Sequence, residues 1–408
     1  MFVPASCSGC PLAQTVSGVN RYNGANHLNQ ATTGFVIDLN AIITRTSTET
    51  IPAPGAKEAI SKLQKNQVPF AIVAQDARTP RNEVSPSLEK HLGLSVDVRS
   101  VIMPETPFHW YIRDYRDKVV LVVGDWGAKA RNTALHYGFK HVMTTRDVLG
   151  LYPHLYCDPP STPTRGPDGS TNPPWKPLYG DEVKISAIFI FWASADWDYD
   201  MRVVTDLLIS QAGYIGTHSR ENLAHLKHSP DSQPRLYICT AETDPRGGRE
   251  VPLKNGKTWL KSLWERYRAE TGLLLDYSYH GTGCDETTIN YADYVLQKSI
   301  KKLHPESRPF PKTVYMIGKD IPFSVESDKQ KAWQDEDTQR RSIRIDRSKA
   351  QREVAIQDYH PLMRPWHVAA NLKEAVDYAL TEEYWELAEK GLTPMFPRPQ
   401  GSINTLVD

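Results

Sequence analysis

A short apolar stretch that ends in a carboxylate is the feature that most constrains the fold of this chain. Residues 35–37 are apolar, and Asp38 follows directly. A run of this length is typical of a buried strand rather than a helix. A turn and an amphipathic pattern over 52–63 come next, and a second apolar run covers 69–74. This order predicts a parallel strand–helix–strand unit with Asp38 at the carboxyl end of its first strand, where open α/β sheets bind ligands.

Strands and helices continue to alternate along the chain. Strands are expected at 119–123, 142–143, 185–191 and 314–317. Helices are expected at 87–93, 128–137, 201–209, 257–271, 287–303 and 369–380. Glycines follow two of these patterns, at Gly93 and Gly272, which is typical of helix ends. The 408 residues leave room for two domains.

Several of these stretches together resemble a known superfamily. The strand that ends at Asp38, the helix PAPGAKEAISKLQ and the strand VPFAIVAQDA resemble the haloacid dehalogenase superfamily, in particular its branch named after the cat-eye-syndrome critical region. The stretches KVVLVVG, YGFK, DW and VYMIG extend this resemblance from about Thr33 to about Leu380. It implies an α/β fold: a Rossmann-like core, which is a parallel sheet with helices on both faces, plus a large inserted α/β cap domain.

The resemblance also implies a division of the chain. We expect a flexible N-terminal tail at 1–30, a core formed by 31–98 and 276–408, and a cap domain at 99–275. Within the core, 323–353 is rich in charge and poor in apolar residues, which predicts a solvated helix or a disordered insertion rather than a binding arm. A proline-rich stretch at 157–181 predicts a long surface loop in the cap.

Phosphatases of this superfamily divide their chemistry among distinct groups. One carboxylate attacks phosphorus, and a second carboxylate two residues later protonates the leaving group. The resemblance places the nucleophile at Asp38, whereas Asn40 occupies the proton-donor position and its amide cannot donate a proton at useful cost. The hydroxyl that should hold the phosphoryl group is replaced by Ala74, which is followed by Gln75 and Asp76. We expect Ala74, Gln75 and Asp76 to line the substrate site.

The positions of the phosphate-binding lysine and of the metal ligands differ as well. The lysine loop contains Thr282 in a Gly-Thr-Gly sequence and has no ammonium group. In the metal motif Lys319 replaces the first carboxylate, and Asp320 follows. A cation beside Asp38 would take over the charge role of magnesium and repel the ion, so we predict a metal-free site with an internal salt bridge. If Asp320 instead takes the metal role, Asp38 and Asp320 would bind Mg²⁺.

The cap is expected to contribute the remaining candidates. Trp192, Asp196 and Trp197 are predicted to bind substrate, although helix capping and core packing also explain the last two. His280 is a candidate acid or base, because it precedes the altered lysine loop. Asp38 itself also suits a structural role, as the cap of a nearby amide.

Composition excludes several classes of protein. Lys plus Arg balances Asp plus Glu at 48 each, which provides no basic field for nucleic acid. The sequence contains no apolar window of about 18 residues, the length that would predict a membrane span. It also has no secretory signal pattern. Cys7 and Cys10 lie in the expected tail, and the five irregularly spaced cysteines predict no disulfide scaffold. We expect a cytoplasmic protein with a small-molecule substrate; targeting to an organelle by the tail and the oligomeric state stay open.

Three functions remain open. The first is a metal-independent enzyme of the isomerase, cyclase or lyase type, which acts without a cofactor on a small, weakly charged metabolite between core and cap. The second is a magnesium-dependent phosphatase with Asp38 as nucleophile, and the third is a non-catalytic pseudophosphatase. Serine hydrolase and nucleotide-binding motifs are missing from the sequence. The loss of charge across the expected cleft favours the first.

Overall fold

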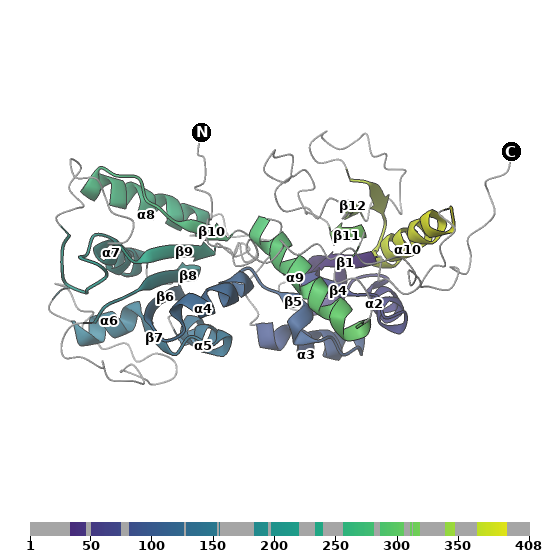
Figure 1. Cartoon of the computed structure of the whole chain (residues 1–408), viewed down its shortest axis with the longest axis horizontal. Coiled ribbons are helices and arrows are strands. Elements are labelled where there is room, and N and C mark those ends of the chain that lie inside the picture. The colour runs from purple at the N-terminus through teal and green to yellow at the C-terminus, as the bar shows by residue number, and fades with distance from the viewer. Residues whose placement is uncertain are drawn as a thin grey trace, which may run out of the picture.

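Two parallel β-sheets, each flanked by helices, organise the protein (Figure 1). The structure is a computed structural model. It describes residues 33–45, 50–74, 81–125, 128–152, 155, 183–194, 197–219, 233–239, 256–280, 286–305, 311, 313–318, 339–346 and 365–389. The expected N-terminal tail at 1–30 and the proline-rich stretch at 157–181 lie outside these residues.

The first sheet has six strands in the order β13-β12-β11-β1-β4-β5, and all its strand pairs are parallel. These strands are β1 (Thr33–Asp38), β4 (Phe70–Val73), β5 (Val101–Ile102), β11 (Thr313–Gly318), β12 (Gln339–Ile345) and β13 (His367–Ala369). All residues of β1 are buried, because neighbouring strands and helices cover both its edges and both its faces. Asp38 pairs with Val73, and Val73 pairs with Ile102, so β1, β4 and β5 end in one row.

Helices cover both faces of this sheet, as the sequence predicted. Phe35 and Ile37 point to the face that packs against one group of helices, whereas Val36 points to the opposite face and α9. The first group is α2 (Ala56–Lys65), α3 (Arg81–Leu92) and α10 (Leu372–Glu389), and α9 covers Glu286–Leu303. A short helix, α1 (Leu39–Ile42), follows β1 directly, and β2 (Ile43–Arg45) and β3 (Thr50–Pro52) form an antiparallel pair beyond it.

The second sheet has five parallel strands in the order β10-β9-β8-β6-β7. They are β6 (Val119–Asp125), β7 (His141–Thr144), β8 (Ala187–Ser194), β9 (Arg235–Cys239) and β10 (Ser278–His280). One face packs against α6 (Thr145–Leu151), α7 (Trp197–Leu208) and α8 (Gly256–Thr271). The other face packs against α5 (Ala128–Tyr137), α4 (Ile112–Tyr115) and the 3₁₀ helix η3 (Thr106–Tyr111). This sheet is therefore a second α/β unit with its own core.

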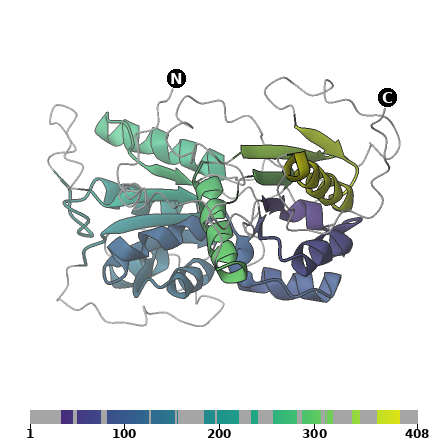
Figure 2. The ribbon, with the colours of Figure 1, turned by 45° about the vertical axis from the view of Figure 1, so that its right-hand side comes forward.

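The chain crosses between the two sheets twice. It leaves the carboxyl end of β5 through η3 and α4, and it returns from the carboxyl end of β10 to α9, which lies at the boundary between the two halves (Figures 1 and 2). The hydroxyl of Tyr111 and Nε2 of His280 lie 3.0 Å apart and join the two crossings by a hydrogen bond. Both crossings leave from carboxyl ends of strands, which brings these ends of the two sheets to the junction.

Two expected boundaries need correction. The core was expected to end at residue 98, but β5 still belongs to the first sheet. The core was expected to resume at residue 276, but β10 still belongs to the second sheet. Sheet membership therefore moves the boundaries past Ile102 and His280. The two strands are short, of two and three residues, so they leave little apolar pattern in the sequence.

The expectation of a solvated helix or disorder across 323–353 is wrong for its later part. Residues 339–345 form β12, which pairs with β11 over the whole length of β11. Arg341, Ile343 and Ile345 are buried in alternation, which is the period of a strand. Arg341 occupies an inward position because its guanidinium donates to the Tyr315 hydroxyl at 3.3 Å. Charge at an alternating position thus hid the pattern.

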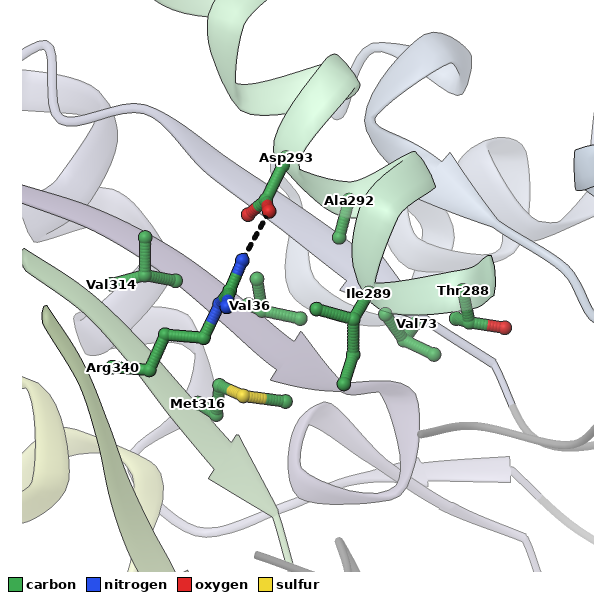
Figure 3. Close-up of a pocket in the computed structure, with 9 residues that line it drawn as sticks. All are labelled: Val36, Val73, Thr288, Ile289, Ala292, Asp293, Val314, Met316 and Arg340. Atoms are coloured by element: carbon green, nitrogen blue, oxygen red, sulfur yellow. Dashed lines mark hydrogen bonds and ion pairs between the residues drawn. The ribbon is translucent and has the colours of Figure 1, made fainter. Parts of the chain in front are cut away.

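A second arginine of β12 connects this strand to α9 (Figure 3). Arg340 Nη2 lies 2.5 Å from Asp293 Oδ2, and both side chains are largely buried. Burial raises the pKa of the Asp293 carboxyl, while the positive charge of Arg340 acts in the opposite direction. The pair borders a cavity of about 10 Å³ with apolar walls that include Val36 and Met316. That volume holds about one water molecule, so the cavity is not a substrate pocket.

Within the part of the chain that the structure describes, none of the helices combines the length and the apolar character that crossing a lipid bilayer requires.

Gly124, near the end of β6, should tolerate no side chain. Its φ is +150°, and a Cβ atom there would lie 2.9 Å from the backbone nitrogen of Trp192 in β8. Gly138 provides a matched control, since its φ is +113° but a Cβ atom would meet only Ile112 Cγ2 at 3.7 Å. Backbone strain alone costs about 1–3 kcal/mol. We expect Gly124→Ala to lower the free energy of unfolding by clearly more than Gly138→Ala in urea titrations; equal losses would contradict the close approach.

Candidate functional site

Asp38 lies where β1 becomes α1, at the carboxyl end of the central strand of the first sheet. Its side chain is only 1% exposed. Oδ1 accepts a hydrogen bond of 2.9 Å from the backbone N–H of Asn40, so Asp38 is the N-cap of α1. The capping role predicted as an alternative is therefore present. It fixes the carboxylate at the edge of the sheet where ligands bind in open α/β folds.

Two uncharged residues predicted to belong to the site, Ala74 and Asn40, are among those that the structure describes. Ala74 follows β4, is buried, and donates its backbone N–H to the carbonyl oxygen of Ile102 at 2.8 Å. Asn40 is exposed, and it lines a second cavity of about 10 Å³ together with Ile345 and Asn371. The structure thus places Asp38 and Ala74 at neighbouring strand ends. The exposed side chain of Asn40 belongs to the surface near β12 and α10.

His280, the candidate acid or base of the second sheet, is buried among aromatic rings. Its Nε2 is hydrogen-bonded to Tyr111, and its ring meets Phe108 edge to face at a centroid distance of 5.4 Å. Burial lowers the pKa of His280 to about 4, so its imidazole is neutral at physiological pH. A neutral imidazole accepts or donates a single proton but gives no positive charge to an anionic substrate.

The two tryptophans predicted to bind substrate have different surroundings. Trp192 lies near the carboxyl end of β8, and the Lys129 ammonium lies 4.5 Å from the centre of its ring. Trp197 begins α7 and packs in the hydrophobic core between this helix and the second sheet. The structure therefore brings Trp192 and His280 to the carboxyl ends of this sheet, and it favours the packing role for Trp197.

The remaining predicted site residues lie outside the described residues: Gln75, Asp76, Asp196, Thr282, Lys319 and Asp320. Among the residues that the structure describes, no three His, Cys, Asp or Glu side chains are grouped as metal ligands would be. Of the two residues predicted as alternative magnesium ligands, Asp38 is among the described residues and Asp320 is not. The salt bridge between Lys319 and Asp38 and the metal role of Asp320 stay predictions, and we assign no step to a metal ion.

Sequence reasoning missed Glu105. It lies in the turn after β5, where the N–H of Thr106 donates to the carbonyl of Met103 at 2.9 Å, and the side chain is only 1% exposed. Burial raises the pKa of Glu105 to about 7, against the opposing positive charges of Lys129 and Arg81. Its Oε2 has no hydrogen-bond partner within the described residues. The sequence signal was a lone carboxylate in the otherwise uncharged stretch 101–108, directly after a strand.

The architecture defines a class. A parallel α/β sheet with a buried carboxylate at the end of its central strand, joined by two crossings to a second α/β unit, is an α/β core with a cap. Residues 35–140 match the family described as haloacid dehalogenase-like hydrolase. This part of the chain is haloacid dehalogenase-like, which confirms the predicted superfamily and fold class, whereas the branch named after the cat-eye-syndrome critical region stays a prediction.

Two curated relatives match the chain at low identity. The chain is 22% identical over 330 residues to the cardiolipin synthase (CMP-forming)/mitochondrial hydrolase fusion protein of Schizosaccharomyces pombe, which covers 78% of this chain and 49% of that protein. It is 22% identical over 217 residues to the mitochondrial hydrolase YKR070W of Saccharomyces cerevisiae, which covers 52% of this chain and 54% of that protein. The chain spans about half the length of the curated relatives it matches.

Solved structures with a related shape are more distant. Hypothetical protein PH1952 of Pyrococcus horikoshii OT3 has a TM-score of 0.47 at 12% identity and covers 85% of this chain and 99% of that chain. NagD of Escherichia coli K-12 has a TM-score of 0.44 at 12% identity and covers 84% of this chain and 97% of that chain. No statement about activity follows from likeness at this level.

Glu105 should make stability depend on pH. Because its pKa rises from 4.5 to about 7 on folding, the folded protein keeps a proton in this window that the unfolded chain has lost. The contribution of Glu105 is therefore complete below pH 4.5 and is lost as pH rises through 7. We expect the stability of Glu105→Gln relative to wild type to increase by about 3 kcal/mol across this window in urea titrations. Parallel pH profiles would contradict the raised pKa.

Proposed function

We propose that the protein is an enzyme that acts on a small, weakly charged molecule bound where the carboxyl ends of the two sheets meet, and that Asp38 is its reactive carboxylate. The burial and position of Asp38 carry this proposal. Asp38 is 1% exposed and lies at the carboxyl end of the central strand, where open α/β sheets bind their ligands. The N–H of Asn40 holds the carboxylate in place.

A weakly charged substrate fits the groups around Asp38. A phosphate ester needs cations or several donors to balance its charge. Ala74 offers no hydroxyl, and His280 is neutral. Lys129 of α5 lies over the ring of Trp192, near the end of β8, and its charge acts on the Glu105 carboxyl. These neutral and aromatic surroundings support isomerase, cyclase or lyase chemistry without a metal, in which Asp38 takes or returns a proton.

A hydrolase is the second candidate, and the comparisons favour it. The family match is to hydrolases, and both curated relatives carry the word hydrolase in their names. In this form Asp38 attacks the substrate as a nucleophile. For a phosphatase, Asp38 and Asp320 would hold Mg²⁺, which would polarise the phosphoryl group.

The names of the relatives also bear on the compartment. The cytoplasm was predicted from the sequence, whereas both curated relatives are named mitochondrial. Mitochondria are therefore the alternative location for this chain. We keep a small-molecule substrate as the proposed partner in either compartment.

The decisive test is turnover of a panel of phosphate esters and uncharged metabolites by pure protein, with magnesium and with EDTA. We expect no magnesium-dependent phosphate release, and conversion of an uncharged compound that persists in EDTA and is abolished in Asp38→Asn. Asp97→Asn is the matched control. Asp97 makes the same cap bond, accepting from the N–H of Arg99 at 2.9 Å, but lies at the surface.

The other outcomes select the alternatives. Magnesium-dependent hydrolysis that is lost in Asp38→Asn and in EDTA would replace the first function by the phosphatase. If wild type converts no compound, and thermal unfolding shows no ligand that distinguishes it from Asp38→Asn, the protein is a pseudophosphatase and the proposal is wrong.

A further inference from the structure

The site has lost one carboxyl group and has a second one in an unexpected place. Asn40 cannot hold a transferable proton two residues after Asp38. We propose that Glu105 is the proton-holding carboxyl group of this site and takes the role that Asn40 cannot fill. This inference rests on the proposed use of Asp38, but it assigns a new residue from another strand end.

The register of the first sheet places Glu105 at the same edge as Asp38. Asp38, Val73 and Ile102 form one row across β1, β4 and β5. Two strand spacings of about 4.8 Å separate the ends of this row, roughly 10 Å in all. Glu105 follows in the turn after β5, which the hydrogen bond from Met103 N–H to Thr106 Oγ1, at 2.8 Å, also holds. Glu105 comes three residues after Ile102, so Asp38 and Glu105 both follow strands that end in this row.

The two halves of the protein both contribute to the surroundings of Glu105. Arg81 of α3 faces it from the first sheet, and Lys129 and Tyr137 of α5 face it from the second. The guanidinium of Arg81 is held by the carbonyl of Val101 at 2.8 Å. Tyr291 of α9 interacts with both Arg81 and Tyr137, and so belongs to the surroundings of Glu105 as well. Glu105 therefore lies at the junction itself rather than inside either half.

The carboxyl group is arranged to exchange a proton. Its Oε2 is fully buried and no donor among the described residues lies within full hydrogen-bond distance of it, although the Tyr137 hydroxyl is close enough to lower the pKa of the carboxyl. A buried polar atom without a partner costs free energy, so such atoms are rare and call for an explanation such as a ligand. A carboxyl whose pKa lies near neutrality donates and recovers a proton with similar ease.

Lys129 connects Glu105 to the aromatic end of β8. Its ammonium lies 4.5 Å from the ring centre of Trp192, and its charge acts on Glu105. A molecule held between Asp38 and the end of β8 would meet the Glu105 carboxyl. In the proposed step, written for an ester, a bond forms between the Asp38 carboxylate and the substrate while the bond to the departing oxygen breaks. The proton of Glu105 bonds to that oxygen, and the electron pair of the broken O–H bond stays on Glu105 as a carboxylate. Water then breaks the bond to Asp38: its hydroxyl adds to the substrate group, and its proton returns to Glu105.

The first experiment measures the proton directly and needs no substrate. Infrared spectra of full-length protein labelled with ¹³C-glutamate are recorded from pH 4 to pH 9 for wild type and for Glu105→Gln. Ordinary glutamates have ionised by about pH 6, so above that pH we expect one remaining protonated carboxyl band in wild type, which disappears near pH 7, close to the raised pKa of Glu105, and is missing from the variant. The absence of such a band in wild type would overturn the proposal, whether or not the protein proves to be an enzyme.

The second experiment uses leaving groups that differ in their need for a proton. Phenyl acetate and phenyl phosphate release a basic phenolate, whereas their 4-nitrophenyl counterparts release an anion that needs no proton. For each pair of esters that wild type hydrolyses, we expect Glu105→Gln to lower kcat for the phenyl compound by about 100-fold or more, with little effect on the 4-nitrophenyl compound. The limb of the pH profile near 7 should disappear, and KM should change little. The exposed Glu83→Gln variant is the control.

A rescue variant separates chemistry from structure. Asn40→Asp restores a carboxyl at the position the superfamily uses, so the double variant Asn40→Asp/Glu105→Gln should recover at least tenfold in kcat over Glu105→Gln. An equal loss for both leaving groups, with an unchanged pH profile and no rescue, would show a merely structural role and overturn the proposal. If wild type converts none of the four compounds, hydrolysis, the second candidate function, fails, while the infrared band still decides whether Glu105 holds the proton.

Discussion

The parallel pairing of β1 with β4 and β11 is the constraint on which the rest of the structure depends. β1 is buried on both faces, and its apolar residues alternate between the cores on the two sides of the sheet. Each such buried side chain contributes about 1.5–3 kcal/mol. This packing offsets the cost of enclosing the Asp38 carboxylate at the strand end. The same register aligns the ends of β4 and β5, so one set of backbone hydrogen bonds places both carboxyl groups of the candidate site.

The charges at the junction compensate each other locally rather than forming a field. Arg340 pairs with Asp293, Arg81 and Lys129 face Glu105, and Lys129 also lies over Trp192. Among the described residues, these three cations therefore each have an acidic or aromatic partner.

Features that depend on neighbouring residues could be predicted from the sequence, whereas features that depend on tertiary contacts could not. The strand before Asp38 and the helix ends at Gly93 and Gly272 follow from apolar period and backbone geometry, and the structure confirms them. Strand β9 was not among the expected strands. β12 escaped prediction because Arg341 takes an inward position that depends on Tyr315, a residue of another strand. Glu105 escaped because its burial comes from α3, α5 and α9, which are distant in sequence. Neither environment could be predicted from the residues adjacent in sequence.

The hydrogen bond between Tyr111 and His280 has a mechanical consequence. Tyr111 lies where the chain enters the second α/β unit, and His280 lies where it leaves this unit, so the bond fastens the entrance and the exit to each other. The edge-to-face contact of Phe108 with His280 adds packing to the same contact. A force applied to either connection would therefore act on this contact before it reaches the strands of the unit.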